Sequence, residues 1–125
     1  MIARAVAALA LAGTIGAAAP ERDDLAKALA GRVPGEPQSC ITLGSNDGPQ
    51  IIDAHTILYR HSGKRVWRTG PIGACPSLRP LNTLVIEVWG GQLCMNDRFR
   101  VVTPGLSIPS GYCRFDSFTP YDKIR

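Results

Sequence analysis

The side chains that could do chemistry are few and widely spaced in this 125-residue chain. The two histidines are His55 and His61, and Asp53 lies two residues before His55. Residues two apart on a strand share a face but lie about 7 Å apart along its axis, and a metal ion would need a third ligand from elsewhere. We therefore interpret Asp53 and His55 as a polar strand face, and we predict no metal site, no cofactor and no catalytic residue.

Two further catalytic arrangements are weakly supported. Ser45 lies in Gly-Ser-Asn-Asp-Gly, residues 44–48, which is typical of a turn and differs from the strand-to-helix elbow of a serine nucleophile. Paired carboxylates about 5 to 9.5 Å apart would serve glycoside hydrolysis, and the interior acids are Asp53, Glu87, Asp97 and Asp116. Asp97, three residues after Cys94, is predicted to accept hydrogen bonds from backbone amides in a turn or bulge.

The densest basic segment, residues 59–68, interleaves aromatic residues with positive charges around a Ser-Gly-Lys turn. Such a pattern suits contact with phosphate, sulfate or sugar surfaces through charge and ring stacking. The candidate ligand-binding residues are Arg60, Lys64, Arg65, Trp67 and Arg68. The alternative is a solvated hairpin tip whose Tyr59 and Trp67 point inward.

The first residues have the three parts of an export signal. Arg4 precedes an apolar run, residues 5–19, that is shorter than the roughly 20 residues needed to cross a bilayer. We predict a signal peptide over residues 1–18, no transmembrane span after its cleavage, and export to the periplasm or the medium. Cleavage removes one basic residue and leaves thirteen against ten acidic ones, a net charge of +3. This charge permits weak binding to anionic envelope polymers but predicts no specific nucleic-acid partner.

Four dispersed cysteines predict a covalent scaffold. No two of them have the short spacing of zinc ligands, and a catalytic thiol would need a free cysteine beside a histidine. An even number of cysteines behind an export signal is typical of disulfides, here two. Three connectivities are open, and the sequence alone does not choose among them. We expect Cys40–Cys113 and Cys75–Cys94, because the first bridge would tie the terminal strands together.

The remaining pattern predicts mainly β structure. A short helix over residues 22–32 is followed by a Pro/Gly-rich linker. Strands are predicted at 40–43, 50–61, 65–69, 83–89, 92–102 and 111–118. We expect a small antiparallel β-sandwich or partly open barrel of five to six strands, braced by disulfides. The predicted organisation is a signal peptide (1–18), a helix and linker (19–38) and the β domain (39–125).

Five strings of residues form a pattern across most of the predicted β domain. They are Cys40-Ile-Thr-Leu, Ile51-Ile-Asp-Ala-His-Thr-Ile-Leu-Tyr-Arg, Cys75-Pro-Ser-Leu, Gln92-Leu-Cys-Met-Asn-Asp and Cys113-Arg-Phe, which together span about residues 40–120. This pattern resembles an uncharacterised family of small exported proteobacterial proteins. The resemblance implies export and a cysteine-bearing domain, and it implies no chemistry.

The function that we expect is a non-catalytic periplasmic or secreted β-module. It would bind an anionic envelope component or a partner protein, through the basic hairpin or a sheet edge. One alternative is a small hydrolase of cell-envelope polymer that uses the interior carboxylates. Another is an inhibitor whose loop, residues 71–80, enters a partner's site. The sequence predicts neither the ligand nor the oligomeric state.

Overall fold

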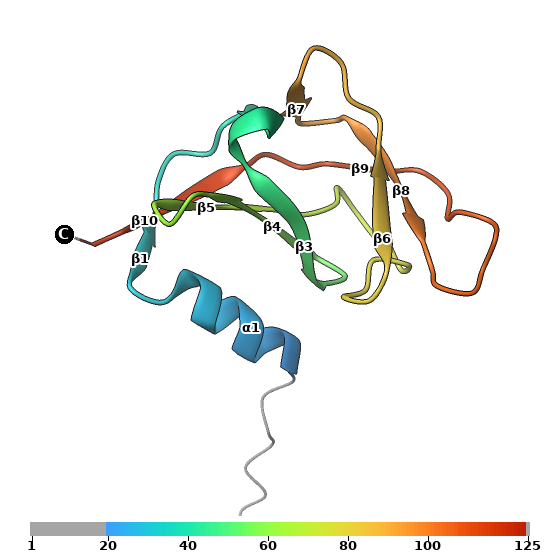
Figure 1. The fold of residues 1–125 in the computed structure, drawn as a ribbon, viewed down its shortest axis with the longest axis horizontal. Coiled ribbons are helices and arrows are strands. Elements are labelled where there is room, and N and C mark those ends of the chain that lie inside the picture. Colours follow the sequence, from blue (N-terminus) through green and yellow to red (C-terminus); the bar gives the residue numbers. More distant parts are fainter. Residues whose placement is uncertain (1–19, 125) are drawn as a thin grey trace, which may run out of the picture.

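The computed structural model describes residues 20–124. The predicted signal peptide, residues 1–18, lies outside the described residues. Within these residues the chain forms one α-helix, α1 (Pro20–Leu29), a 3-10 helix (Leu43–Ser45) and ten short strands (Figure 1). The strands are β1 Arg32–Pro34, β2 Cys40–Thr42, β3 Asp47–Asp53, β4 Thr56–His61, β5 Arg65–Thr69, β6 Thr83–Ile86, β7 Gln92–Cys94, β8 Arg98–Val102, β9 Cys113–Arg114 and β10 Thr119–Lys123.

The helix α1 ends where local chemistry allows. The chain leaves the helix before Gly31, whose φ of +69° is a left-handed conformation that glycine adopts freely. Among the described residues the helix covers Pro20–Leu29, so it ends three residues before the predicted end at residue 32.

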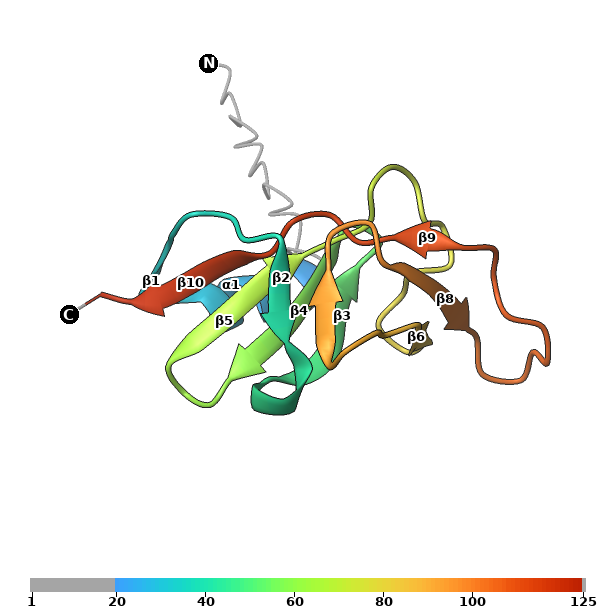
Figure 2. The ribbon, with the colours of Figure 1, turned by 90° about the horizontal axis from the view of Figure 1, so that it is seen from above.

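A five-stranded antiparallel sheet, in the order β1-β10-β5-β4-β3, forms the centre of the fold. The strands β4 and β5 have buried residues on both faces, because α1 covers one face and the smaller sheets cover the other (Figures 1 and 2). Leu58 and Val66 face the helix, whereas Tyr59 and Trp67 face the main core. β1 pairs with β10, so residues 32–34 of the segment predicted as helix and linker (19–38) belong to this sheet.

Two smaller antiparallel sheets, β2-β7 and β6-β8-β9, cover the face of the central sheet that lies opposite α1. Between the layers is the main core, which contains Ile41, Ile51, Ile57, Tyr59, Trp67, Cys75, Leu78, Leu93, Phe99, Val101, Phe115 and Phe118. Within residues 20–124 the sheets do not close into a barrel, since β3 and β6 are edge strands of different sheets. The predicted mainly β, antiparallel, disulfide-braced fold is confirmed.

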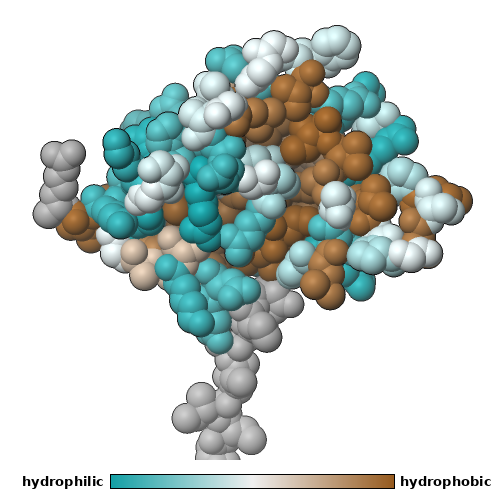
Figure 3. Space-filling model, in the orientation of Figure 1, coloured by the Kyte–Doolittle hydropathy of each residue, from teal (hydrophilic) through white to brown (hydrophobic). Residues whose placement is uncertain are grey.

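The main core is incompletely covered on the side of β6. Leu84 and Ile86 pack against it but stay half-exposed, and so does Leu43 of the 3-10 helix. Figure 3 shows hydrophobic side chains gathered on this side of the molecule, in the region between β3 and β6. The open part of the sandwich therefore exposes apolar surface.

Two of the predicted long strands are each divided by a turn. The predicted strand 50–61 becomes β3 and β4, and the predicted strand 92–102 becomes β7 and β8. In each turn an aspartate accepts a backbone amide at 2.7 Å: Asp53 that of His55, and Asp97 that of Cys94. The prediction that Asp97 is a turn acceptor is confirmed. Because of the second turn, β7 pairs with β2 while β8 pairs with β6.

All four cysteines form disulfides, but the predicted pairing is wrong. The bridges are Cys40–Cys94 and Cys75–Cys113. Cys40 lies directly opposite Cys94 in the β2-β7 pair, which follows from the turn that sends β7 to β2. The expected link between terminal strands is unnecessary, because β1 and β10 are joined by their own backbone hydrogen bonds.

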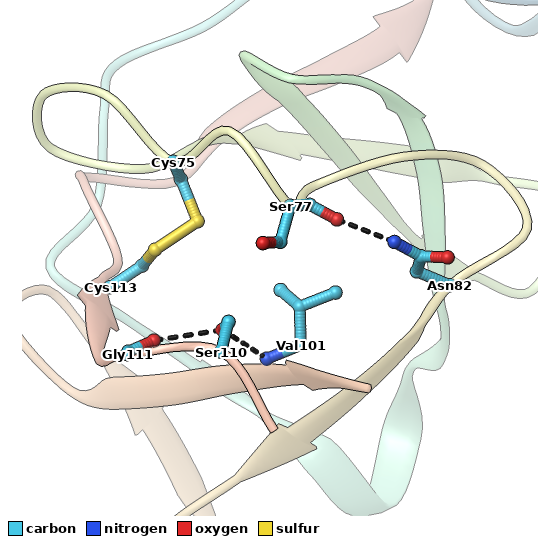
Figure 4. Close-up of a disulfide and its surroundings, with 7 residues drawn as sticks. All are labelled: Cys75, Ser77, Asn82, Val101, Ser110, Gly111 and Cys113. Carbon is cyan, nitrogen blue, oxygen red and sulfur yellow. Dashed lines mark hydrogen bonds between the residues drawn. A yellow bond between two sulfur atoms is a disulfide. The ribbon is translucent and has the colours of Figure 1, made fainter. Parts of the chain in front are cut away.

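The second bridge ties the long loop between β5 and β6 to β9 (Figure 4). Around it, the Ser110 hydroxyl accepts the amide of Val101 at 2.9 Å and donates to the carbonyl of Gly111 at 2.8 Å. The Asn82 side chain donates to the carbonyl of Ser77 at 2.7 Å. These contacts hold both segments next to the buried Cys75.

Candidate functional site

Strand alternation separates the five predicted binding residues. Arg60 pairs with Val66, and Arg68 pairs with Leu58, so these two arginines lie on the face that α1 covers. Arg65 and Trp67 lie on the opposite face, and Lys64 is exposed at the hairpin tip. The structure therefore does not bring the predicted set together on one surface, because neighbouring residues on a strand point to opposite faces.

Three of the five residues line one cleft. It has a volume of about 880 Å³ and lies between the β4-β5 hairpin and the segment formed by β2 and the 3-10 helix. The charged and polar residues that line it are Lys64, Arg65, Asp122, Lys123, His61, Asn46, Ser45 and Thr42, with Trp67 beside them. We use the name hairpin cleft for this site.

An ion pair between neighbouring strands lies in the hairpin cleft. The Arg65 guanidinium donates from Nε to Asp122 Oδ1 at 2.7 Å and from Nη2 to Asp122 Oδ2 at 2.8 Å. Such a bidentate contact fixes the geometry of the guanidinium plane. The hydrogen bond from Arg65 lowers the pKa of the Asp122 carboxyl, and the same bond raises the pKa of Arg65.

Arg65 also stacks on an aromatic ring. Its Cζ atom lies 5.1 Å from the centre of the Trp67 ring, within the range of a cation–π contact. The Trp67 side chain is buried, with 9% of its surface exposed. The aspartate and the tryptophan thus hold Arg65 in one position before any ligand arrives.

Two polar atoms at the hairpin cleft have unused hydrogen-bonding capacity. Among the described residues, the buried Trp67 Nε1 donor and the buried Asn46 Oδ1 acceptor have no hydrogen-bond partner. Both residues line the cleft, and the Asn46 amide nitrogen is held by the carbonyl of Thr42. Buried polar groups in native proteins are nearly always paired, so these two atoms are exceptions that lie beneath the surface of the cleft.

The hairpin cleft carries an excess of positive charge. Three basic side chains and one carboxylate line it, and together these four groups give a net charge of +2. Asp122 already pairs with Arg65, and within residues 20–124 the ammonium groups of Lys64 and Lys123 have no ion-pair partner. The two lysines are therefore the groups whose charge is open to an anion.

The interior acids each have a separate local role. Asp53 and Asp97 accept backbone amides in turns, and Asp116 accepts the amide of Ser117 at 2.7 Å. Glu87 accepts hydrogen bonds from Arg98 and Tyr112. In the described part of the chain, no group of three or more histidine, cysteine or carboxylate side chains lies in an arrangement that could hold a metal ion.

Sequence reasoning missed three titratable members of the hairpin cleft, His61, Asp122 and Lys123. His61 pairs with Arg65 across the hairpin, and the two-residue period of the strands was a signal that could have grouped them. Asp122 and Lys123 belong to β10, which was not predicted, and their position beside β5 is a long-range pairing.

The compartment and the ancestry of the chain are only partly indicated. Two disulfides indicate an oxidising environment, as found outside the cytoplasm. None of the helices among the described residues is long and apolar enough to cross a membrane. No protein-family model, no curated protein and no solved structure matches the chain. The resemblance to a family of exported proteobacterial proteins therefore stays a prediction.

Proposed function

We propose that the protein is a non-catalytic binding module of the periplasm or the extracellular space, which binds an anionic component of the cell envelope in the hairpin cleft. The observation that carries the proposal is the net positive charge of that cleft around a preorganised arginine. Arg65 is held by Asp122 and Trp67, so an anion that reaches it loses little free energy to ordering the side chain.

The ligand chemistry follows from the groups that remain open. Lys64 and Lys123 are exposed and can approach phosphate, sulfate or carboxylate oxygens as mobile point charges. A phosphorylated lipid headgroup and an acidic polysaccharide share this chemistry.

The test uses the intrinsic fluorescence of the hairpin cleft. The chain has two tryptophans, so a Trp89→Phe background leaves Trp67 as the only one. This protein would be titrated separately with phosphatidylglycerol vesicles, dextran sulfate and polygalacturonate at low salt. We expect a salt-sensitive change in Trp67 emission with at least one of these probes, and the arm that responds identifies the source of the anion.

Two double variants with equal charge change separate the hairpin cleft from the hairpin as a whole. Lys64→Gln with Lys123→Gln removes the two open charges of the cleft, and we expect binding to weaken about fivefold. Arg60→Gln with Arg68→Gln alters the opposite face of the same hairpin and should leave the affinity within about twofold. No change in Trp67 emission with any probe, or equal losses in the two variants, would refute the proposal.

A further inference from the structure

The outer face of the β6-β8-β9 sheet carries a second group of basic residues. On β8, Arg98 and Arg100 point outward while Phe99 and Val101 between and beyond them are buried. Arg114 of β9 lies directly opposite Arg98, and directly opposite residues share a face of the sheet. Three arginines from two strands therefore lie together on one surface.

An aromatic ring and one carboxylate organise this face. The Cζ atoms of Arg98 and Arg100 lie 4.6 Å and 4.0 Å from the centre of the Tyr112 ring. Glu87 accepts a hydrogen bond from Arg98 Nη2 at 3.2 Å through Oε2, and one from the Tyr112 hydroxyl at 3.2 Å through Oε1. Glu87 thereby shows how this face holds a carboxylate, with a guanidinium on one oxygen and a phenol on the other.

The positive charge on this face exceeds the negative charge that the protein supplies. Like charges directly opposite each other on neighbouring strands are about 4.5–5.5 Å apart at Cβ and destabilise the pair, and Arg98 and Arg114 are such a pair. Glu87 neutralises one of the three arginines. Within the described residues, Arg100 Nε is buried without a hydrogen-bond partner, and the Arg114 guanidinium has no ion-pair partner.

We propose that this arginine face, made of Arg98, Arg100 and Arg114 with Tyr112 and Glu87, binds the carboxylates of a linear acidic polysaccharide. Arg100 and Arg114 carry the same kind of Nη donor that Arg98 offers to Glu87, and the paired Nη groups of a guanidinium match the two oxygens of a carboxylate. Residues two apart on β8 repeat at about 7 Å, so a polymer with recurring acidic groups engages more than one arginine at a time.

This proposal stands apart from the hairpin cleft, because the two sites share no residue. The arginine face is the outer surface of a three-stranded sheet, and Tyr112 is 46% exposed on it. An extended chain that lies across the sheet can contact this aromatic side chain and the arginines, whereas a single small anion can neutralise only one or two of the charges.

The first test removes the arginines that have no anionic partner. The Arg100→Gln/Arg114→Gln variant of the full exported chain would be titrated with polygalacturonate in parallel with Lys27→Gln/Arg79→Gln, an exposed pair elsewhere with the same charge change. We expect the first variant to bind about fivefold more weakly, with a shallower salt dependence, and the control to stay within about twofold of the parent.

A second variant, expected to bind more tightly, tests whether weaker binding by the arginine variant comes from loss of structure. Glu87→Gln frees the Arg98 guanidinium for a ligand carboxylate, so we expect polygalacturonate to bind about two- to threefold more tightly. Glu36→Gln makes the same chemical change at an exposed position outside both sites and should have no effect. A variant with disrupted packing would bind polygalacturonate more weakly, so loss of structure cannot produce this gain.

The outcomes distinguish this proposal from the one for the hairpin cleft. Unchanged binding by Arg100→Gln/Arg114→Gln, an equal loss in the Lys27→Gln/Arg79→Gln control, or weaker binding by Glu87→Gln would each overturn the arginine face. Arginine-dependent binding to phosphatidylglycerol vesicles without binding to polygalacturonate would also overturn it. If only the Lys64→Gln/Lys123→Gln variant binds polygalacturonate more weakly, the hairpin cleft is supported as the binding site and the arginine face is rejected.

Discussion

Removing the bridge between Cys75 and Cys113 tests the scaffold that positions the arginine face. The bridge joins residues 38 apart in the sequence and ties β9 to the loop between β5 and β6. Treating the bridge as a restriction on the unfolded chain, a loop of this length contributes about 3.9 kcal/mol at 25 °C. We expect Cys75→Ala/Cys113→Ala to lower the free energy of unfolding by about that amount.

Alanine is the appropriate replacement because Cys75 is only 2% exposed in the main core. A serine there would add a buried hydroxyl and a further cost of about 1–3 kcal/mol, which would obscure the effect of the bridge. The measurement is equilibrium urea unfolding of the oxidised proteins, followed by far-UV circular dichroism. A loss below about 1 kcal/mol would show that the bridge does not restrict the unfolded chain as argued.

Two further cysteine variants test the pairing directly. Cys40→Ala/Cys94→Ala leaves Cys75 and Cys113, which should form a disulfide and expose no titratable thiol. Cys75→Ala/Cys94→Ala leaves Cys40 and Cys113, which belong to different bridges and should remain as two thiols in the monomer. An intramolecular disulfide in the second variant would contradict the strand pairing that places Cys40 opposite Cys94.

Two other predictions concern the central sheet. The folded-state pKa of Asp122 is lowered chiefly by the hydrogen bond from Arg65. The ion pair therefore adds to the free energy of unfolding above the unfolded pKa of about 4, and this stabilisation is lost as the pH falls through the folded pKa. Because both side chains are about half exposed, Asp122→Asn should lower the free energy of unfolding by only about 0.2–1 kcal/mol at pH 7. The variant should also lose less stability than the parent on acidification. Parallel acid unfolding curves of variant and parent would argue against this ion pair. Gly70→Ala would place a methyl group onto the carbonyl oxygen of His55 and should cost about 1–3 kcal/mol in urea unfolding. Gly63→Ala meets nothing within 4 Å and should be neutral or stabilising, and equal costs for the two glycines would refute the steric argument.

The basic hairpin shows how far a local pattern predicts a site. The Ser-Gly-Lys turn and a hairpin around it are present as predicted, although the first strand begins at Thr56 instead of residue 50. Turn chemistry and β propensity act over a few residues. Arg60 and Arg68 nevertheless face α1, while Arg65 and Trp67 face the main core. Alternation along the strands predicts that these residues lie on opposite faces, but a count of charges along the segment ignores which face each residue occupies. Asp122, the partner of Arg65, comes from a strand 57 residues away.

The arginine face was likewise only partly predictable from the local sequence. Arg98 and Arg100 alternate with buried residues, which is a visible signal for an exposed basic strand face. Arg114 joins them only because β9 pairs with β8 in the register that places it opposite Arg98. The Tyr112 ring then brings the charges into one group, and nothing in the spacing of the four residues predicts that contact.

By itself, the sequence determined that the chain forms mainly β structure, that its cysteines form bridges, and that a short helix precedes the strands. These properties depend on residue composition, on local periodicity and on an even number of dispersed cysteines. Only the tertiary structure decided which cysteines pair, which charges meet and where the cleft opens. The physical reason is that these outcomes depend on which strands become neighbours, and each such neighbour is chosen by burial of the whole core rather than by the residues next to it in the chain.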